Sequence, residues 1–255
     1  MTIFADKTAA VTDLRANQLM LASQTHLSDM TLSDDYLYSK LLAAESEASK
    51  ILRVFLEPTM VLPADATQAE IDALDAAHTR YVLEPGYDYD PEMFTGNTWG
   101  FIALRQKPVI AVTALYFQYP SPQNTVFQVP VSWVRLDRKY GHIQLVPAAA
   151  SFSAPLSAFM MQAMGGGRTI PFMLQVRYTA GIKNVQAEYP EVVMLIKRLA
   201  VLNVLKDSFV PQSGSISADG LSQSISLDVD KYMDSTQQSL DRIRDEIHGV
   251  RLGVF

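Results

Sequence analysis

The stretch "YPEVVMLIKRLAVLNVLKDSF", residues 189–209, decides the fold of this 255-residue chain. Pro190 suits the first turn of a helix, where the backbone N–H that proline lacks would have no partner. The residues after it are apolar on most faces, and a helix of that kind is buried almost all round. We therefore expect these residues to form a helix in the interior of the protein.

A second long helix is expected to begin at Ser33. Serine is a favoured N-cap residue, and the two acids that follow it suit the positive end of the helix dipole. Pro58 is expected to end this helix, and residues 8–22 are expected to form an earlier one. Within the long helix the apolar residues recur at helical spacing: Leu37, Leu41, Ala44, Ala48, Ile51, Leu52 and Phe55.

A shorter helix is expected to start after Thr67. The sequence "TQAE" at 67–70 matches a capping box, in which the first and fourth side chains each bond the other residue's backbone N–H. Ile71 and Leu74 would then lie on one side of this helix.

The last expected helix starts at Asp228 or Asp230 and ends at Gly249. It is mostly polar, and its apolar line is too narrow for a buried helix but suits packing against one neighbour. We predict that this line makes contacts between subunits through Met233, Leu240, Ile243 and Ile247.

The middle of the chain, residues 81–182, is rich in proline, glycine and aromatic residues. Residues 109–120 are β-branched and aromatic, residues 131–147 resemble a hairpin that turns at 137–141, and residues 172–181 resemble a strand that stops at a glycine. This part is expected to be rich in β-structure.

The segment "SGSISADGLSQSISLD", residues 213–228, is rich in serine yet carries branched apolar residues on both sides of Asp219-Gly220. Asp-Gly is a favoured hairpin turn, so one interpretation is a two-stranded tongue that needs a partner sheet or groove. Its predicted inter-subunit contacts are Ile216, Leu221, Ile225 and Leu227.

Two further segments are candidates for contact with a partner. Residues 155–168 are rich in methionine and end in three glycines, as suits a plastic surface, although core packing is the alternative. The tail "VRLGVF" at 250–255 offers one charge and several apolar anchors, and it either docks on another protein or is disordered. The predicted docking residues are Arg251, Leu252, Val254 and Phe255.

Composition excludes several functions. The net charge of −6, from 21 basic and 27 acidic residues, argues against tight binding of nucleic acid. The absence of cysteine excludes disulfides, thiolate metal sites and a cysteine nucleophile. We see no signal peptide and no membrane-spanning stretch, so a soluble cytoplasmic product is expected.

The motifs of catalysis are also missing. The histidines at 26, 78, 142 and 248 lack metal-site spacing, and Gly165-Gly166-Gly167-Arg168 lacks the spacing of a P-loop. The acidic stretch 84–92 could bind a cation, but an acidic loop in solvent is the favoured interpretation because the EF-hand spacing is absent. We therefore predict no enzyme, no catalytic residue, no metal and no cofactor.

The two ends of the chain resemble the head–tail connector proteins, or adaptors, of tailed phages. "YLYSKLLAAESEASKILRVFLEPT" (36–59) resembles their early helix, and residues 189–209 resemble their central helix after a proline. Residues 217–249 resemble the long loop and polar last helix that follow. The resemblance implies a ring, commonly of twelve copies, which lies beneath the portal and continues the DNA channel. It also implies that the C-terminal tail docks on the portal.

The fold expected is α+β, with a helical bundle from the N- and C-terminal segments (1–80 and 183–249), a central β-rich insertion (81–182) and a docking tail (250–255). The function expected is that of a structural protein of the virion neck, present in the host cytoplasm during assembly. Its expected partners are further copies, the portal and a tail or stopper protein, while DNA passes through without sequence-specific binding and no membrane is involved.

Two alternatives remain open at this point. One is another tail-completion, stopper or baseplate component. The other is a glycan-binding β module in which Trp99, Trp133 and neighbouring tyrosines stack on sugars, although burial in the core is the more frequent role of such residues.

Overall fold

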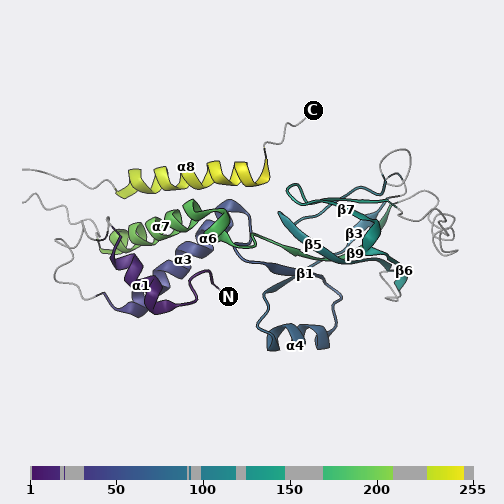
Figure 1. The fold of residues 1–255 in the computed structure, drawn as a ribbon, viewed down its shortest axis with the longest axis horizontal. Coiled ribbons are helices and arrows are strands. Elements are labelled where there is room, and N and C mark those ends of the chain that lie inside the picture. The colour runs from purple at the N-terminus through teal and green to yellow at the C-terminus, as the bar shows by residue number, and fades with distance from the viewer. Residues whose placement is uncertain are drawn as a thin grey trace, which may run out of the picture. The chain divides into compact units, whose positions relative to one another are not determined.

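The computed structural model describes residues 2–17, 20, 32–90, 92, 99–118, 125–146, 169–208 and 229–249 (Figure 1). Within these residues the fold is α+β, as the sequence predicts. The chain forms two compact units. The helical unit comprises Thr2–Arg53 and Asn184–Glu246, and the sheet unit comprises Val54–Lys183 with the residues from Ile247 on.

The helical unit combines the two ends of the chain. Helices α3 (Asp34–Leu52) and α7 (Pro190–Ser208) pack against each other and lie side by side in Figure 1. Helix α1 (Lys7–Arg15) packs on α3, and the short α6 (Val185–Glu188) packs on α7. The unit also contains α8 (Val229–His248) up to Glu246. The predicted bundle of N- and C-terminal helices is therefore present.

Helix α3 begins where the sequence predicts but ends earlier. The Ser33 side chain accepts a hydrogen bond from the Tyr36 N–H, as an N-cap does. The helix stops at Leu52 because Arg53 adopts a left-handed backbone (φ 54°, ψ 40°), which turns the chain out of the helix. Pro58 is therefore not the residue that ends it. The face toward the core consists of Leu37, Leu41, Ala44, Ala48 and Leu52.

Helix α7 is buried almost all round, as its composition predicts. In α7 the residues that are fully buried come from several faces: Val192, Ile196, Ala200, Val201, Leu202, Val204 and Leu205.

Helix α1 ends at Arg15, before the predicted end at residue 22.

The sheet unit contains a six-stranded sheet in the order β2-β1-β9-β5-β6, with β3 pairing with β9. Strands β1 (Thr59–Pro63) and β2 (Tyr81–Glu84) are parallel and are joined through α4 (Gln68–Ala76), while the other pairs are antiparallel. The remaining strands are β3 (Tyr87–Tyr89), β5 (Val109–Gln118), β6 (Thr125–Val129) and β9 (Ile170–Ala180).

A second, three-stranded sheet has the order β4-β8-β7. It contains β4 (Ile102–Ala103), β7 (Val134–Asp137) and β8 (His142–Leu145), and a short 3-10 turn, η2 (Val131–Trp133), precedes β7. Strands β7 and β8 form the predicted hairpin, because Asp137 pairs with His142 and the turn between them includes Gly141 at φ +65°.

The β-structure begins earlier in the chain than residue 81. Strand β1 pairs with β9 in the register Thr59–Ala180, which brings residues 54–80 into the sheet unit and not into the helical unit. The five residues of β1, which follow Pro58 and end on Pro63, show no alternation of apolar and polar side chains. Pairing with β9, more than a hundred residues away, and with β2, beyond α4, makes them a strand.

Strand β9 is the centre of this unit, since it pairs with β1, β3 and β5. Met173, Leu174, Val176 and Tyr178 of β9 are buried together with Leu115 of β5. The strand ends before Gly181, which has φ +113°, a value that other residues rarely adopt.

Candidate interaction sites

A buried polar cluster lies at the end of β2. The Glu84 side chain is 7% exposed, and its Oε1 accepts hydrogen bonds from the hydroxyls of Tyr87 (2.7 Å) and Tyr178 (3.0 Å). Burial raises the pKa of Glu84, although the two hydroxyls and Arg105 act in the opposite direction. Burial likewise raises the pKa of both tyrosines, so they stay protonated donors.

Arg105 covers this cluster without a close ion pair. Its guanidinium donates to the carbonyls of Pro85 and Gly86 and lies 4.1 Å from the centre of the Tyr87 ring, while its Nη1 is 3.9 Å from the Glu84 carboxylate. The backbone N–H of Arg105 donates to the Tyr87 hydroxyl (3.0 Å). The cluster therefore ties β2, β3, β9 and the loop after β4 together, which is a structural role.

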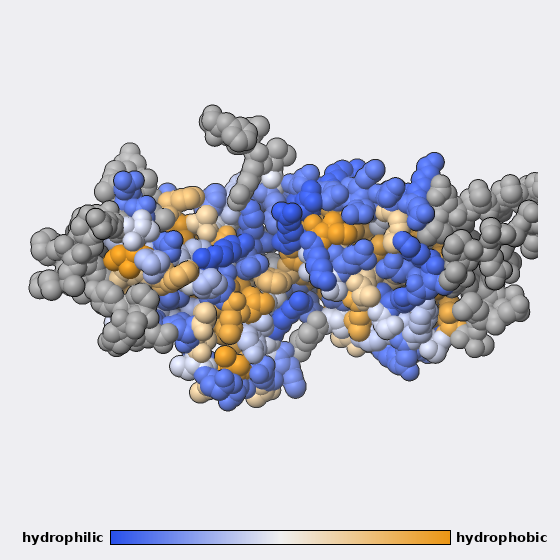
Figure 2. Space-filling model, turned by 180° about the vertical axis from the view of Figure 1, so that it is seen from behind, coloured by the Kyte–Doolittle hydropathy of each residue, from blue (hydrophilic) through white to orange (hydrophobic). Residues whose placement is uncertain are grey.

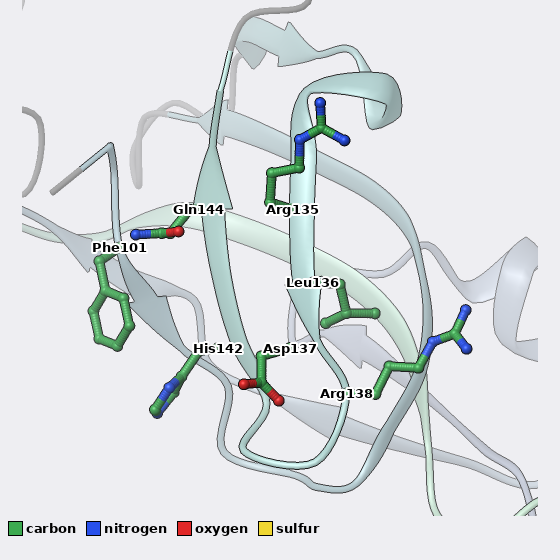
Figure 3. Close-up of a pocket in the computed structure, with 7 residues that line it drawn as sticks. All are labelled: Phe101, Arg135, Leu136, Asp137, Arg138, His142 and Gln144. Atoms are coloured by element: carbon green, nitrogen blue, oxygen red, sulfur yellow. The ribbon is translucent and has the colours of Figure 1, made fainter. Parts of the chain in front are cut away.

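A hollow of about 840 Å³ opens on the three-stranded sheet (Figure 3). Figure 3 shows arginines extending from β7 and the turn after it, while aromatic rings lie toward β4 and β8. The lining residues are Phe101, Arg135, Leu136, Asp137, Arg138, His142 and Gln144.

The rim of this hollow combines exposed cations with aromatic rings. Arg135 and Arg138 are exposed, and Asp137 uses its Oδ1 to accept the Tyr140 N–H (3.2 Å). The His142 ring lies 4.8 Å from that of Phe101 and 5.9 Å from that of Tyr140. The hollow is therefore suited to a negatively charged partner.

Helix α4 carries the opposite charge. Its capping box is present: the Thr67 N–H donates to Glu70 Oε2 (3.0 Å), and the Glu70 N–H donates to Thr67 Oγ1 (3.4 Å). Glu70 also forms a bidentate ion pair with Arg177 of β9 (2.6 and 3.1 Å), which lowers its pKa. The sequence motif locates the cap but does not indicate this long-range pair. Asp72 and Asp75 are exposed.

Several large apolar side chains are exposed among hydrophilic ones, as Figure 2 shows in part. Met194 on α7 is 70% exposed, and Phe172 and Trp99 in the sheet unit are each 49% exposed. Trp133, in contrast, packs against the core and against Phe127 (ring centres 6.2 Å apart). Of the two tryptophans, only Trp99 is therefore presented to a ligand or partner.

The predicted apolar line on α8 is largely covered by the chain itself. Leu240, Ile243 and Ile247 are 0–4% exposed, and Met233 is half-buried. Thr236 completes the line: it is fully buried, and its hydroxyl donates to the Tyr232 carbonyl (2.8 Å). These buried side chains stabilise the subunit. A contact between copies through this line stays a prediction.

Helix α8 also contacts α7 through polar groups. The Arg198 guanidinium lies 5.2 Å from the centre of the Tyr232 ring. Cation–π contacts of this kind are attractive even at exposed sites. The contact indicates that the first turns of α8 lie along α7.

Other predicted contact residues lie outside the described part of the chain. These are the tongue residues Ile216, Leu221, Ile225 and Leu227, the tail residues Arg251, Leu252, Val254 and Phe255, and the methionine-rich segment 155–168. Their roles stay predictions.

Two carboxylates of the acidic stretch that could bind a cation accept backbone N–H groups. Asp88 accepts the Phe172 N–H, and Asp90 accepts the Glu92 N–H, each at 3.0 Å. Among the residues that the structure describes, no three His, Cys, Asp or Glu side chains gather as metal ligands would. Within the same residues no helix combines the length and apolarity needed to cross a bilayer.

No family model matches the chain, and no curated protein matches it. Among solved structures the chain is similar to one described as the neck of an empty GTA particle computed with C6 symmetry. The two chains share 15% identity over 95% of this chain and 94% of the other, with a TM-score of 0.40.

Proposed function

We propose that this chain is a structural protein of the neck of a phage-like particle, a head–tail connector that forms a ring below the portal. The main support is the construction of the helical unit. Helices α3 and α7 pack together although Val54–Lys183 of the sheet unit lies between them in the sequence. The resemblance to connector proteins implies this arrangement, with an early helix and a central helix that precede a polar last helix.

Exposed apolar side chains support a role in assembly. Met194 lies on α7, among buried residues of several faces, and is 70% exposed. Exposed patches that combine apolar residues with a polar rim usually mark protein contacts. We propose that Met194 and the aromatic residues of the sheet unit contact other copies or neck proteins.

The charge of the exposed face of α8 suits a position near DNA that must pass freely. Acids outnumber bases along this helix, and Arg244 already contacts Asp241 and Asp245. A surface with more acids than bases repels the duplex mildly, although Lys231 and Arg242 of α8 are exposed among the acids. In this proposal DNA passes through the ring without sequence-specific binding.

The ring is proposed to hold twelve copies and to bind the portal on one side and a tail or stopper protein on the other. The tail segment 250–255 is proposed to dock on the portal through Arg251, Leu252, Val254 and Phe255. A ring needs two different faces on each copy, one for each neighbour.

Complementation of particles that lack this protein would test the proposal. We expect the full chain to restore joined heads and tails, with density for the protein at the neck in electron micrographs. A chain that ends at Gly249 should fold normally by circular dichroism but fail to bind the purified portal. A full-length V254S/F255S variant, which keeps the chain length but removes two apolar anchors, should also fail to bind the portal. If the protein is located in the baseplate, or if the truncated chain binds the portal normally, the proposal is wrong.

Exposed aromatic residues favour one candidate of another class, a glycan-binding module. Trp99 and Phe101 are 49% and 39% exposed, and aromatic faces stack on sugars. This candidate predicts that the protein binds cell-surface glycans on an array and that W99A abolishes the binding. A connector would show no such binding.

A further inference from the structure

We infer that the outward acidic face of α4 in one copy binds the arginine-lined hollow of the next copy in the ring. The inference rests on the proposed function and names one of its contacts. Both surfaces belong to the sheet unit, and they are two different patches of one chain. Pairing two different patches is heterologous, which is the geometry that a ring requires.

Helix α4 is a crossover helix that buries almost nothing. Helices that connect parallel strands normally pack an apolar face on the sheet, yet none of the nine residues of α4 is fully buried. Figure 1 shows α4 set off from the strands. Its attachment is the ion pair of Glu70 with Arg177, so most of its surface is available to a partner.

The helical repeat determines which residues face away from the sheet. Each residue advances by about 100° around the axis, so Asp72 and Asp75 lie about 200° and about 140° from Glu70. Because Glu70 is fixed to the sheet by Arg177, the two aspartates lie on the opposite side. Gln68 shares that side and donates to Asp72 Oδ1 (2.8 Å). Helix α4 contains no basic residue, so this face is negative.

The hollow is complementary to this face. Within the described residues neither Arg135 nor Arg138 forms an ion pair, and both are exposed. Lys139 adds a third cation to this turn, against one acid, Asp137. Phe101 is 39% exposed beside them and can cover the half-buried Ile71 at the flank of α4. Three cations less one acid leave two positive charges, which match the two outward aspartates of α4.

Such a contact is weak between two isolated copies and sensitive to salt. Exposed charges are screened beyond about 8 Å at physiological ionic strength. Several copies held on one platform would make it effective, because each further contact becomes intramolecular. We therefore expect this pairing to form when copies gather on the portal.

Thiol crosslinking would test the contact directly, because the chain has no cysteine of its own. In the D75C/R138C variant a short bismaleimide should join neighbouring copies into a ladder of dimers, trimers and larger species. Single-cysteine variants should stop at dimers, and a Q128C/R138C pair, also exposed and in the sheet unit, should give no ladder. A D75C/R138C variant that gives no more oligomer than Q128C/R138C, on the portal or free, overturns the inference.

A charge exchange provides an independent test. R135E/R138E makes both patches negative, and D72K/D75K makes both positive, so each variant alone should lower the yield of assembled particles about tenfold, as for two lost exposed ion pairs. The two variants mixed, or the fourfold variant, should restore assembly. No loss in the single-patch variants, or a loss without rescue, overturns the inference.

The outcomes separate this inference from the proposed function. A ring seen at the neck without crosslinking across this pair overturns the α4 contact alone. A protein absent from the neck overturns the proposed function. Binding of a DNA duplex that is lost in R135E/R138E, with no ladder in the crosslinking assay, would assign the arginines to nucleic acid and overturn the inference.

Discussion

Replacing Leu240 by alanine should destabilise the isolated protein. Leu240 is fully buried within one chain, in the middle of the apolar line of α8. Leucine-to-alanine changes at such positions cost about 2–5 kcal/mol, because they remove apolar burial and leave a cavity. For chains of this size about 1 kcal/mol corresponds to roughly 2–4 °C in Tm. We therefore expect Tm to fall by roughly 10 °C.

Urea denaturation followed by circular dichroism, at two protein concentrations, would measure this effect. The loss should be the same at both concentrations, because the surface that covers Leu240 belongs to the same chain. Q238A, an exposed change on the same helix, should alter stability by less than about 0.5 kcal/mol. If L240A unfolds like the wild type when dilute and differs only where copies associate, then a neighbouring copy covers Leu240 and the packing of α8 described above is wrong.

Three further predictions concern the sheet unit. Burial raises the pKa of Glu84 above its usual 4.5, so the folded state holds this proton more tightly than the unfolded state does. The free energy of unfolding that protonated Glu84 contributes is present below pH 4.5 and is lost as the pH rises through the folded pKa. The E84Q variant should show no such loss. If urea denaturation gives the two proteins free energies of unfolding that change in parallel with pH, the prediction is wrong. T67A should cost about 1 kcal/mol through loss of the capping box and T67S much less, measured by urea denaturation; equal losses would refute the cap. G181A should destabilise by about 1–3 kcal/mol or more, because φ is +113° and a Cβ would lie 2.5 Å from the Glu57 carbonyl oxygen; an unchanged Tm would show that the backbone relaxes there.

Much of the secondary structure could be predicted because its signals are local. The N-cap at Ser33, the capping box at Thr67 and the glycine end of α8 at Gly249 depend on residues a few positions apart. The hairpin of β7 and β8 was predictable for the same reason, since its turn and its partner strand are adjacent in sequence.

The end of α3 shows where local signals are insufficient. Pro58 is a strong helix breaker, but the chain leaves the helix at Arg53. Arg53 has a left-handed backbone, although arginine has no intrinsic preference for that conformation. The N–H of Ile182 donates to the Phe55 carbonyl (3.0 Å), and Gly181 lies against the same segment. The turn at Arg53 is accompanied by contacts with a distant part of the chain, which local sequence patterns do not show. The sequence alone therefore predicts the end of α3 at Pro58, five residues after Arg53.

The candidate surfaces depend even more on the tertiary structure. The sequence shows acids in α4 and cations near 135–139, but only the pair of Glu70 with Arg177, 107 positions apart, shows which acids face outward. The same holds for Leu240, which a helical pattern marks as apolar but cannot assign to its own chain or to a neighbour.

By itself the sequence determined the α+β class, the burial of α7 on most of its faces, the N-caps at Ser33 and Thr67 and the turn of the β7–β8 hairpin, because these follow from side-chain chemistry over a few residues. Only the tertiary structure decided that Thr59–Pro63 is a strand, that Glu84 is sealed between two tyrosines and that the apolar line of α8 is covered within the subunit. The physical reason is that strand pairing and burial depend on contacts between two segments. Their contribution to the free energy of folding arises only when residues far apart in the sequence come together.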